Sequence, residues 1–446
     1  MSSTVKSDKI QGATGTTVTV PSGHNLVATD ALKADTIQAS SDDVLTIPSS
    51  LNVTGYSANV SGNVSVARSL VVGYTDGRIP QANLEVTGNV VMSGASYPSS
   101  GGLWSGRSVA INGAMQVSQR GTSEASITTA KYAEAPDRWG IQITTAGTWT
   151  ASQSTTSPDG FSHSYKMDCT TADASLAAGD RLYLYQKIEG QNLQRFAKGT
   201  SSAEKYIVSF WVRSAKTGTY ICSLWDAINT RQCSQSYTIG SADTWTQIVV
   251  DFPADTTGVI TPVSTQGMQL IFYLAAGTTY TSGTLSTTWE ASTNANRAVG
   301  QVNLADSTSN DFYITGIQME AGDAATPFEH ESYAQTLQKC ERYYTEQGAG
   351  VIGFFNGSTN IEIPFQFFPP MRATPTVAVL LSNPTISNKT SSGTGTQSGV
   401  SLVNSSGTAN GFYFVQVDNC DTSTSASAGN AAQFRTDNFM SFSAEL

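Results

Sequence analysis

Apolar and polar residues alternate with a period of two through the middle of the chain. In YIVSFWVRS, residues 206–214, Val208, Phe210 and Val212 fall on one side, so we expect that side to face a core. Similar runs occupy residues 180–190, 217–225, 244–252, 267–275 and 310–320. Several such strands joined by turns predict a sandwich or jelly roll rather than an α/β fold.

One stretch changes the period. In ESYAQTLQKCERYY, residues 331–344, the positions i, i+4, i+7 and i+11 are Tyr333, Leu337, Cys340 and Tyr344. This spacing predicts a short helix with one apolar stripe. We expect the stripe to pack against the sandwich or against the same helix in partner chains. Cys340 would then be buried rather than reactive.

The first hundred residues contain an internal repeat. KSDKIQGATGTTVTVPSG begins at Lys6 and KADTIQASSDDVLTIPSS begins at Lys33, so the period is 27 residues. Each copy and the segments that follow give strands too short to bury a face alone, so stacked repeats or neighbouring chains must cover them. We expect a homotrimeric shaft in residues 1–100, with a monomeric β-domain as the alternative. The small residues of 95–106 predict a linker after it.

Alternation returns after the helix and predicts a β-sandwich tip in residues 346–446. Asn-Gly pairs at 356–357 and 410–411 predict hairpin turns. Two long polar segments, 387–399 and 418–430, predict exposed loops at one end of the tip. Asn388 and Asn419 stand in these loops and are our candidate tip contacts, with plain surface loops as the alternative.

Composition supports the all-β prediction and limits the chemistry. Charged residues make up 13% of the chain, against about 25% in ordinary soluble domains. The net charge is −10 and the chain has no run of Lys or Arg, so we expect no nucleic-acid partner. We also expect no secretory signal and no membrane insertion, because the N-terminus is polar and long apolar stretches are missing.

The residues that usually carry catalysis or bind metals are scattered. The five cysteines include no C-x-x-C pair, which favours reduced thiols and no zinc site; a disulfide between Cys222 and Cys233 across a hairpin is the alternative. The three histidines are far apart and match no ligand or catalytic motif. We therefore expect no cofactor, no metal and no enzyme activity.

Three separated motifs resemble those of bacteriophage tail-fibre and other virion fibre proteins. They are ITGIQMEAGDAATPFEHESYAQTLQKCERYY at 314–344, VAINGAMQVSQRGTS at 109–123 with PDRW at 136–139, and YIVSFWVRSAKTGTY at 206–220. The resemblance covers residues 104–345, and FPPMRATPTV also resembles the start of fibre tips. It implies a carbohydrate-binding-module-like jelly roll in a fibre that recognises host surface glycans, without chemistry.

Sugar recognition requires flat aromatic surfaces and nearby groups that pair with hydroxyls. Our candidate glycan contacts are Trp289, Trp139, Trp225, Tyr183 and Asn192. Trp289 comes first because TTWEASTNANRA, residues 287–298, has the composition of a loop, where a Trp has less reason to be buried. Further candidates are Trp149, Tyr185, Gln186, Asp226 and Arg138. For every aromatic residue, packing in the core is the alternative.

We therefore expect four parts: an N-terminal shaft and virion anchor at 1–100, a jelly roll at 104–330, a linking helix at 331–345 and a tip at 346–446. The expected function is multivalent, non-catalytic adsorption of a virion, as a tail fibre, to host surface polysaccharide. Other virion proteins would hold the N-terminal region, and the fibre would assemble in the host cytoplasm. The alternatives are a structural head, neck or capsid fibre and, less favoured, a glycan depolymerase, which requires paired carboxylates.

Overall fold

The computed structural model describes residues 90–92, 95–97, 106–347, 350–356, 360–380, 385–388, 394–396, 401–407, 412–418, 431–434 and 440–446. The expected repeat shaft lies outside these residues except at its end. There β1 (Val90–Met92) pairs antiparallel with β2 (Ala95–Tyr97). The linker prediction is wrong at β2, because Ala95 to Tyr97 form ladder pairs with β1.

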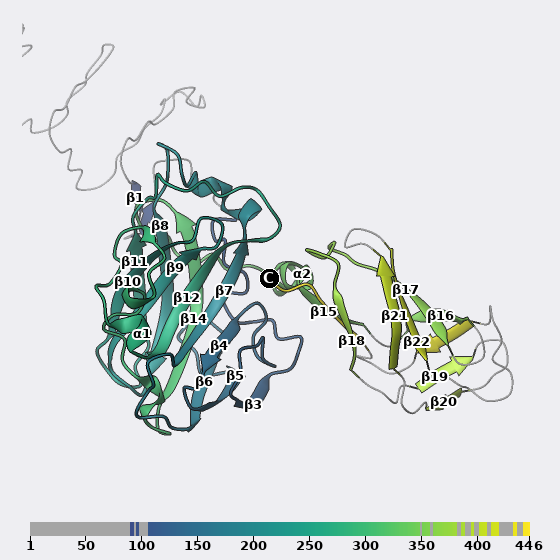
Figure 1. The fold of residues 1–446 in the computed structure, drawn as a ribbon. Helices are drawn as coiled ribbons and strands as arrows, with labels where there is room; N and C mark the ends of the chain where they lie inside the picture. The colour runs from purple at the N-terminus through teal and green to yellow at the C-terminus, as the bar shows by residue number, and fades with distance from the viewer. Residues whose placement is uncertain are drawn as a thin grey trace, which may run out of the picture. The chain divides into compact units, whose positions relative to one another are not determined.

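Two six-stranded antiparallel sheets form the central sandwich (Figure 1). The first sheet consists, in order, of β13 (Glu290–Ala291), β10 (Arg231–Ile239), β9 (Gly218–Asp226), β12 (Gln266–Ala276), β7 (Arg181–Glu189) and β4 (Gly140–Thr144). The second sheet consists, in order, of β11 (Thr246–Phe252), β8 (Tyr206–Ser214), β14 (Asp311–Ala321), β6 (Ser164–Thr171), β5 (Thr148–Ser154) and β3 (Ser123–Ile127). The all-β prediction is confirmed.

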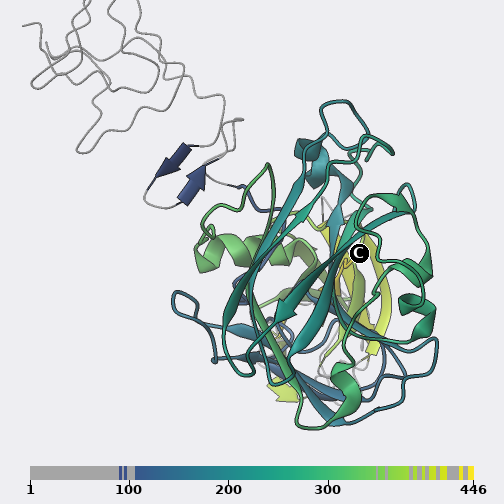
Figure 2. The ribbon, with the colours of Figure 1, turned by 90° about the vertical axis from the view of Figure 1, so that its left-hand side faces the viewer.

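The core lies between the two sheets, which Figure 2 shows after a quarter turn. Val208, Phe210 and Val212 of β8 are all fully buried there, as their alternation predicts. Phe210 meets Phe272 of β12 edge to face, with ring centroids 4.9 Å apart. This aromatic contact joins the inner faces of the two sheets.

Short helices occupy the connections between strands. η1 (Gly190–Phe196) follows β7, and the connection between β12 and β14 holds α1 (Thr278–Thr281), η2 (Asn294–Asn296) and η3 (Leu304–Asp306). This connection also contains β13, the edge strand of the first sheet. It therefore brings residues 277–301 back against the first sheet rather than leaving them as a free loop.

The predicted linking helix is α2 (Tyr333–Glu341), and Ser332 with Gln335 forms a capping box at its start. Its predicted stripe is partly wrong. Cys340 is fully buried, but Tyr333 is 55% exposed and Tyr344 lies in a strand. The helix ends at Glu341, and Arg342 and Tyr343 bind the buried carboxylate of Glu189 instead of extending it.

The tip contains a three-stranded and a seven-stranded sheet. The smaller sheet orders β15 (Tyr344–Gln347), β24 (Met440–Ser443) and β18 (Thr376–Val379). The larger sheet orders β20 (Thr394–Thr396), β19 (Thr385–Asn388), β23 (Ala431–Phe434), β16 (Ile352–Phe355), β17 (Ile361–Gln366), β22 (Phe412–Asp418) and β21 (Ser401–Gly407). The core of the tip lies among residues of both sheets and includes Phe365, Phe367, Tyr413 and Phe442.

The two tip candidates have different outcomes. Asn388 is the last residue of β19 and pairs with Ala432, so the prediction that it belongs to a loop is wrong. The β-branched pair before it, Thr385 and Ile386, suits a strand bonded on both sides. Asn419 lies outside the described residues, as does the pair 410–411. β16 and β17 pair across the predicted turn that begins at Asn356.

The cysteines that the structure describes, Cys169, Cys222, Cys233 and Cys340, are all buried and free. Cys233 lies opposite Leu224 rather than Cys222, so the strand register does not place the two thiols face to face. Burial raises the pKa of Cys233 to about 12. Within the described residues, no helix has the length and apolar character needed to cross a membrane.

Candidate functional site

The outer face of the first sheet carries a second apolar cluster, separate from the core. On β7 and β12, residues that point away from the core include Tyr183, Tyr185, Ile271 and Tyr273. Tyr183 lies opposite Tyr273, with ring centroids 5.1 Å apart, and Tyr185 lies opposite Ile271. We call these four residues together with Trp225 of β9 the aromatic face. Of these five residues, Trp225 alone is partly exposed, so its ring is the one that can cover the C–H face of a sugar.

A glycine shapes one side of the aromatic face. Gly140 of β4 lies opposite Tyr185, and a Cβ at this position would stand 2.4 Å from Tyr185 Cζ. The missing side chain therefore lets the tyrosine ring lie across β4. This is a local reason for glycine within a strand.

Amide and charged side chains continue the rows of the aromatic face. Lys187 lies opposite Gln269, and Gln269 lies opposite Trp225. Gln142 stands opposite Tyr183 on the neighbouring strand. Trp225, Gln142 and Lys187 are partly exposed. The face therefore combines aromatic rings with groups that pair with hydroxyls, which is the chemistry of a sugar site.

Two buried donors at the aromatic face have no hydrogen-bond partner among the described residues. They are the indole Nε1 of Trp225 and Nε of Arg181. Buried polar groups in proteins nearly always have a partner, so each unfilled donor indicates a missing acceptor. Both atoms are enclosed by the protein, so a ligand on this sheet reaches them only if neighbouring side chains move.

Residues 277–301 cover one end of the aromatic face. Tyr280 packs into the cluster, and the guanidinium carbon of Arg297 lies 5.9 Å from the ring centre of Trp225. Tyr183 and Tyr185 are 6% and 7% exposed, so only their edges reach solvent. Burial raises the pKa of Tyr185 to about 12, so its hydroxyl stays protonated at neutral pH.

The structure separates the five sequence candidates. It brings Tyr183 and Trp225 together on the aromatic face. Trp139 points to the opposite side, is 2% exposed and donates its indole N–H to the carbonyl of Asn112 at 3.2 Å. Trp139 is thus a core residue and not a surface for glycans. Trp149 is likewise fully buried.

Trp289, the first candidate, is held by contacts with three other residues. Its indole N–H donates to the carbonyl of Pro253 at 2.7 Å, and its ring packs near Tyr206 with centroids 5.8 Å apart. The Lys198 ammonium lies 5.1 Å from its ring centre. The expectation of a free loop is wrong here, because Trp289 leads directly into β13 and packs against the core.

A buried ion-pair network holds this edge of the first sheet. Lys198 Nζ is 2.7 Å from Asp226 Oδ2 and 3.0 Å from Asp255 Oδ2, and all three side chains are nearly inaccessible. Arg231 binds both oxygens of Asp255. Burial alone raises the pKa of Asp255, but hydrogen bonds from Arg231 and Lys198 outweigh it and leave that pKa below its ordinary value. No sequence pattern predicts this network.

Three of the four polar candidates, all but Asn192, bind other groups of the protein. Asp226 belongs to the Lys198 network. Gln186 accepts from the backbone N–H of Ile111 at 2.7 Å and donates to its carbonyl at 2.8 Å. Arg138 is 1% exposed and pairs with Glu445. These groups stabilise the fold rather than present themselves to a ligand.

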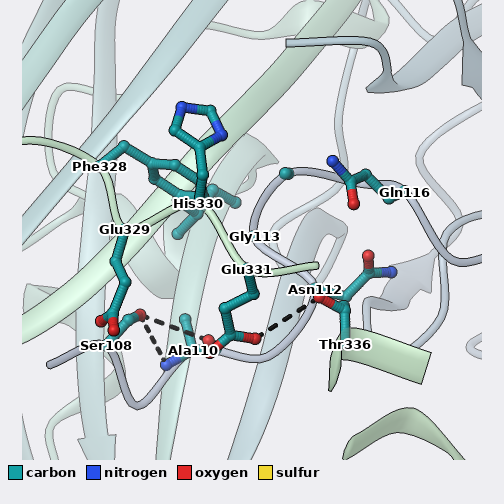
Figure 3. Close-up of a pocket in the computed structure, with 12 residues that line it drawn as sticks. Ser108, Ala110, Asn112, Gly113, Gln116, Phe328, Glu329, His330, Glu331 and Thr336 are labelled. Atoms are coloured by element: carbon teal, nitrogen blue, oxygen red, sulfur yellow. Dashed lines mark hydrogen bonds between the residues drawn. The ribbon is translucent and has the colours of Figure 1, made fainter. Parts of the chain in front are cut away.

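Figure 3 shows a small pocket lined by Glu329, His330 and Glu331, with a volume of about 20 Å³. Its carboxylates already have partners. Glu329 accepts from the backbone N–H groups of Gly106 and Arg107, and Glu331 pairs with Lys339. Both carboxylates therefore stabilise the fold. The volume of the pocket is large enough for a water molecule but not for a sugar. Among the described residues, no group of three or more His, Cys, Asp or Glu is placed to hold a metal ion.

Asn192, the fifth candidate, is an exposed residue of η1. It does not reach the aromatic face. It lines a separate cavity of about 320 Å³ between η1, α2 and residues 106–111. The structure thus places the candidates in three locations: the aromatic face, the core with its edge, and this cavity.

Comparison with solved structures finds distant likeness. A domain of tailspike protein 4 of bacteriophage CBA120 has a TM-score of 0.26 at 12% identity, over 50% of this chain and 24% of that one. A putative sugar-binding protein of Bacteroides thetaiotaomicron has a TM-score of 0.27 at 12% identity, over 48% of this chain and 100% of that one. A family 22 carbohydrate-binding module of Clostridium thermocellum Xyn10B has a TM-score of 0.23 at 12% identity, over 47% and 98%. No family model and no curated protein matches the sequence.

Proposed function

We propose that the central sandwich binds glycans without catalysis and that the chain is a virion fibre, most directly a tail fibre, which adsorbs to host surface polysaccharide. The observation that carries the binding proposal is the aromatic face with its unfilled donors, at Trp225 and Arg181. The fibre role rests on the three sequence motifs that resemble virion fibres. In such a fibre the chain would be a homotrimer held to other virion proteins by its N-terminal region, and three weak sites would gain avidity.

The test uses the full chain and an array of bacterial surface glycans. Trp225→Ala should weaken binding at least tenfold, because it removes the most exposed ring of the aromatic face. Trp225→Phe keeps one aromatic ring but removes the indole N–H together with the second ring. A loss smaller than that of Trp225→Ala would therefore show that ring stacking supplies part of the affinity. Trp245→Ala is the matched control, since Trp245 is also partly exposed but packs near Tyr313 at the second sheet.

Equal binding by Trp225→Ala and the parent, with both folded by circular dichroism, would refute the proposed site. Sedimentation of the full chain as a monomer at micromolar concentration would refute the trimer.

One observation favours a second function, a structural head, neck or capsid fibre without a receptor role. Tyr183, Tyr185 and Tyr273 are at most 7% exposed, so they also seal the sheet beneath residues 277–301. A receptor-binding fibre added as purified protein should compete with phage for host cells, whereas a structural fibre should not. Competition thus separates the two functions.

A further inference from the structure

The cavity beside Asn192 differs from the rest of this acidic chain in its charge. Its charged lining residues are Arg195 from η1 and Lys339 and Arg342 from the end of α2, and all three are cations. The whole chain has a net charge of −10. With about 320 Å³, the cavity falls in the size range of small-ligand pockets and has room for one sugar unit.

The carboxylates that balance these cations do not line the cavity. Glu189 binds Nε and Nη2 of Arg342 at 2.8 and 2.9 Å and is fully buried. Glu331 pairs with Lys339 and lines the small pocket of Figure 3 instead. Arg342 and Lys339 are therefore each held by an ion pair beside the cavity that they line, and Nη1 of Arg342 also donates to the carbonyl of Pro370 at 3.3 Å.

Arg195 has hydrogen-bonding capacity left over. Its Nη1 donates to the carbonyls of Gly106 and Arg107, and its Nε and Nη2 have no partner among the described residues. Burial lowers the pKa of Arg195 more than the nearby Glu329 raises it, so its charge is under-compensated. The amide of Asn192 makes no hydrogen bond to any described residue. An anion with adjacent hydroxyls would satisfy both groups.

Tyr343 makes the cavity wall rigid. Its hydroxyl donates to Glu189, and the guanidinium of Arg138 lies 3.5 Å from its ring centre. A wall fixed from both sides reduces the entropy lost when a ligand binds.

We propose that this cavity binds the carboxylate of an acidic sugar unit, such as a uronic acid, within the glycan that the sandwich recognises. The planar guanidinium fork of Arg195 matches a carboxylate, Lys339 and Arg342 add charge, and Asn192 pairs with ring hydroxyls. The inference rests on the proposed glycan-binding function and adds a ligand class and a second contact area. It predicts a preference for acidic over neutral polysaccharides.

The test measures binding of glucuronate, glucose and inorganic sulfate to the full-length protein by ligand-observed NMR. Glucuronate should bind at least tenfold more tightly than glucose, and sulfate should compete only weakly. Lys339→Gln and Asn192→Ala should each weaken glucuronate binding about three- to tenfold, the effect of one lost polar contact. Lys205→Gln is the matched control, because Lys205 is a half-exposed lysine paired with Asp251 away from the cavity.

Equal affinity for glucuronate and glucose, or unchanged binding in folded Lys339→Gln, would overturn the proposal. Sulfate competing as well as glucuronate would overturn the sugar part of it. The proposed function has its own readout: polysaccharide binding that depends on Trp225 but not on Lys339 would leave glycan binding in place and remove only the acidic specificity. Glucuronate binding without any polysaccharide binding would leave a site for acidic sugars in place and remove the proposed polysaccharide-binding function.

Discussion

The two outer faces of the sandwich carry similar aromatic residues in different surroundings. On the second sheet, Tyr313 lies near Arg213 and Lys166, at 4.8 and 5.6 Å from the ring centre, and these cations pair with Asp243 and Asp168 on the surface. On the first sheet, the rings of the aromatic face adjoin Gln142 and Gln269, and Trp225 has an unfilled donor. On the second sheet, the protein thus pairs the charged groups with one another. On the first sheet, it leaves hydrogen-bonding capacity for a ligand. The neighbours of an aromatic residue, more than its strand, decide whether it is available to a ligand.

The largest expected effect is on unfolding free energy, from removal of the buried ion pairs of Lys198. Lys198→Met would leave Asp226 and Asp255 with fewer partners, at the buried edge of the first sheet. Breaking a buried pair costs about 3–5 kcal/mol of unfolding free energy, against at most about 1 kcal/mol for a surface pair. Urea unfolding measures this, with Lys205→Met as the surface control. Equal losses in the two variants would show that the buried network has no special weight.

Gly140→Ala tests the shape of the aromatic face. The new Cβ would push against the Tyr185 ring, so we expect a loss of about 1–3 kcal/mol, the usual cost of overpacking, together with weaker glycan binding. Thermal unfolding and the glycan array measure the two effects. Gly179→Ala is the control, because a Cβ at Gly179 meets nothing within 4 Å. Unchanged binding in Gly140→Ala would show that the ring position is not needed.

Acid should weaken the first sheet through Asp255. Because its pKa is lowered in the folded state, its contribution is complete above the ordinary Asp pKa of about 3.9 and is lost as the pH falls through the folded pKa. Urea unfolding between pH 5 and 2 should therefore show a steeper decline for the parent than for Asp255→Asn. Parallel curves would contradict the coupling to Arg231 and Lys198.

The smallest effect is expected on the second face. Lys166→Gln removes a partly exposed ion pair with Asp168 and a contact near Tyr313. We expect less than about 1 kcal/mol in unfolding free energy and no change in glycan binding. A clear loss of binding would move the glycan site to the second sheet and reverse the comparison.

The strands were predictable because their alternation is strong and local. Val208, Phe210 and Val212 face the core as their spacing requires. The end of α2 was less predictable, since a buried acceptor far along the chain, Glu189, takes Arg342 and Tyr343 out of the helical stripe.

The candidate site was predictable only in part. Tyr183 and Trp225 alternate outward from strands, so their sequence runs carry the signal that they lie on a face. Trp289 looked free because its neighbours are small and polar, but its packing depends on Pro253 and Lys198, which are distant in sequence. No local pattern indicates such a contact. The cavity at Asn192 likewise needs three separate segments to meet.

The ion pair between Arg138 and Glu445 joins positions 307 residues apart. Closing so long a stretch of chain is slow and entropically unfavourable before other contacts form. Arg138 is almost completely enclosed, and its counter-charge is the carboxylate of Glu445 in the tip sequence. The carboxylate of Glu445 therefore links the charge balance of the sandwich to the tip, and a sandwich without its tip would lack the partner of this guanidinium.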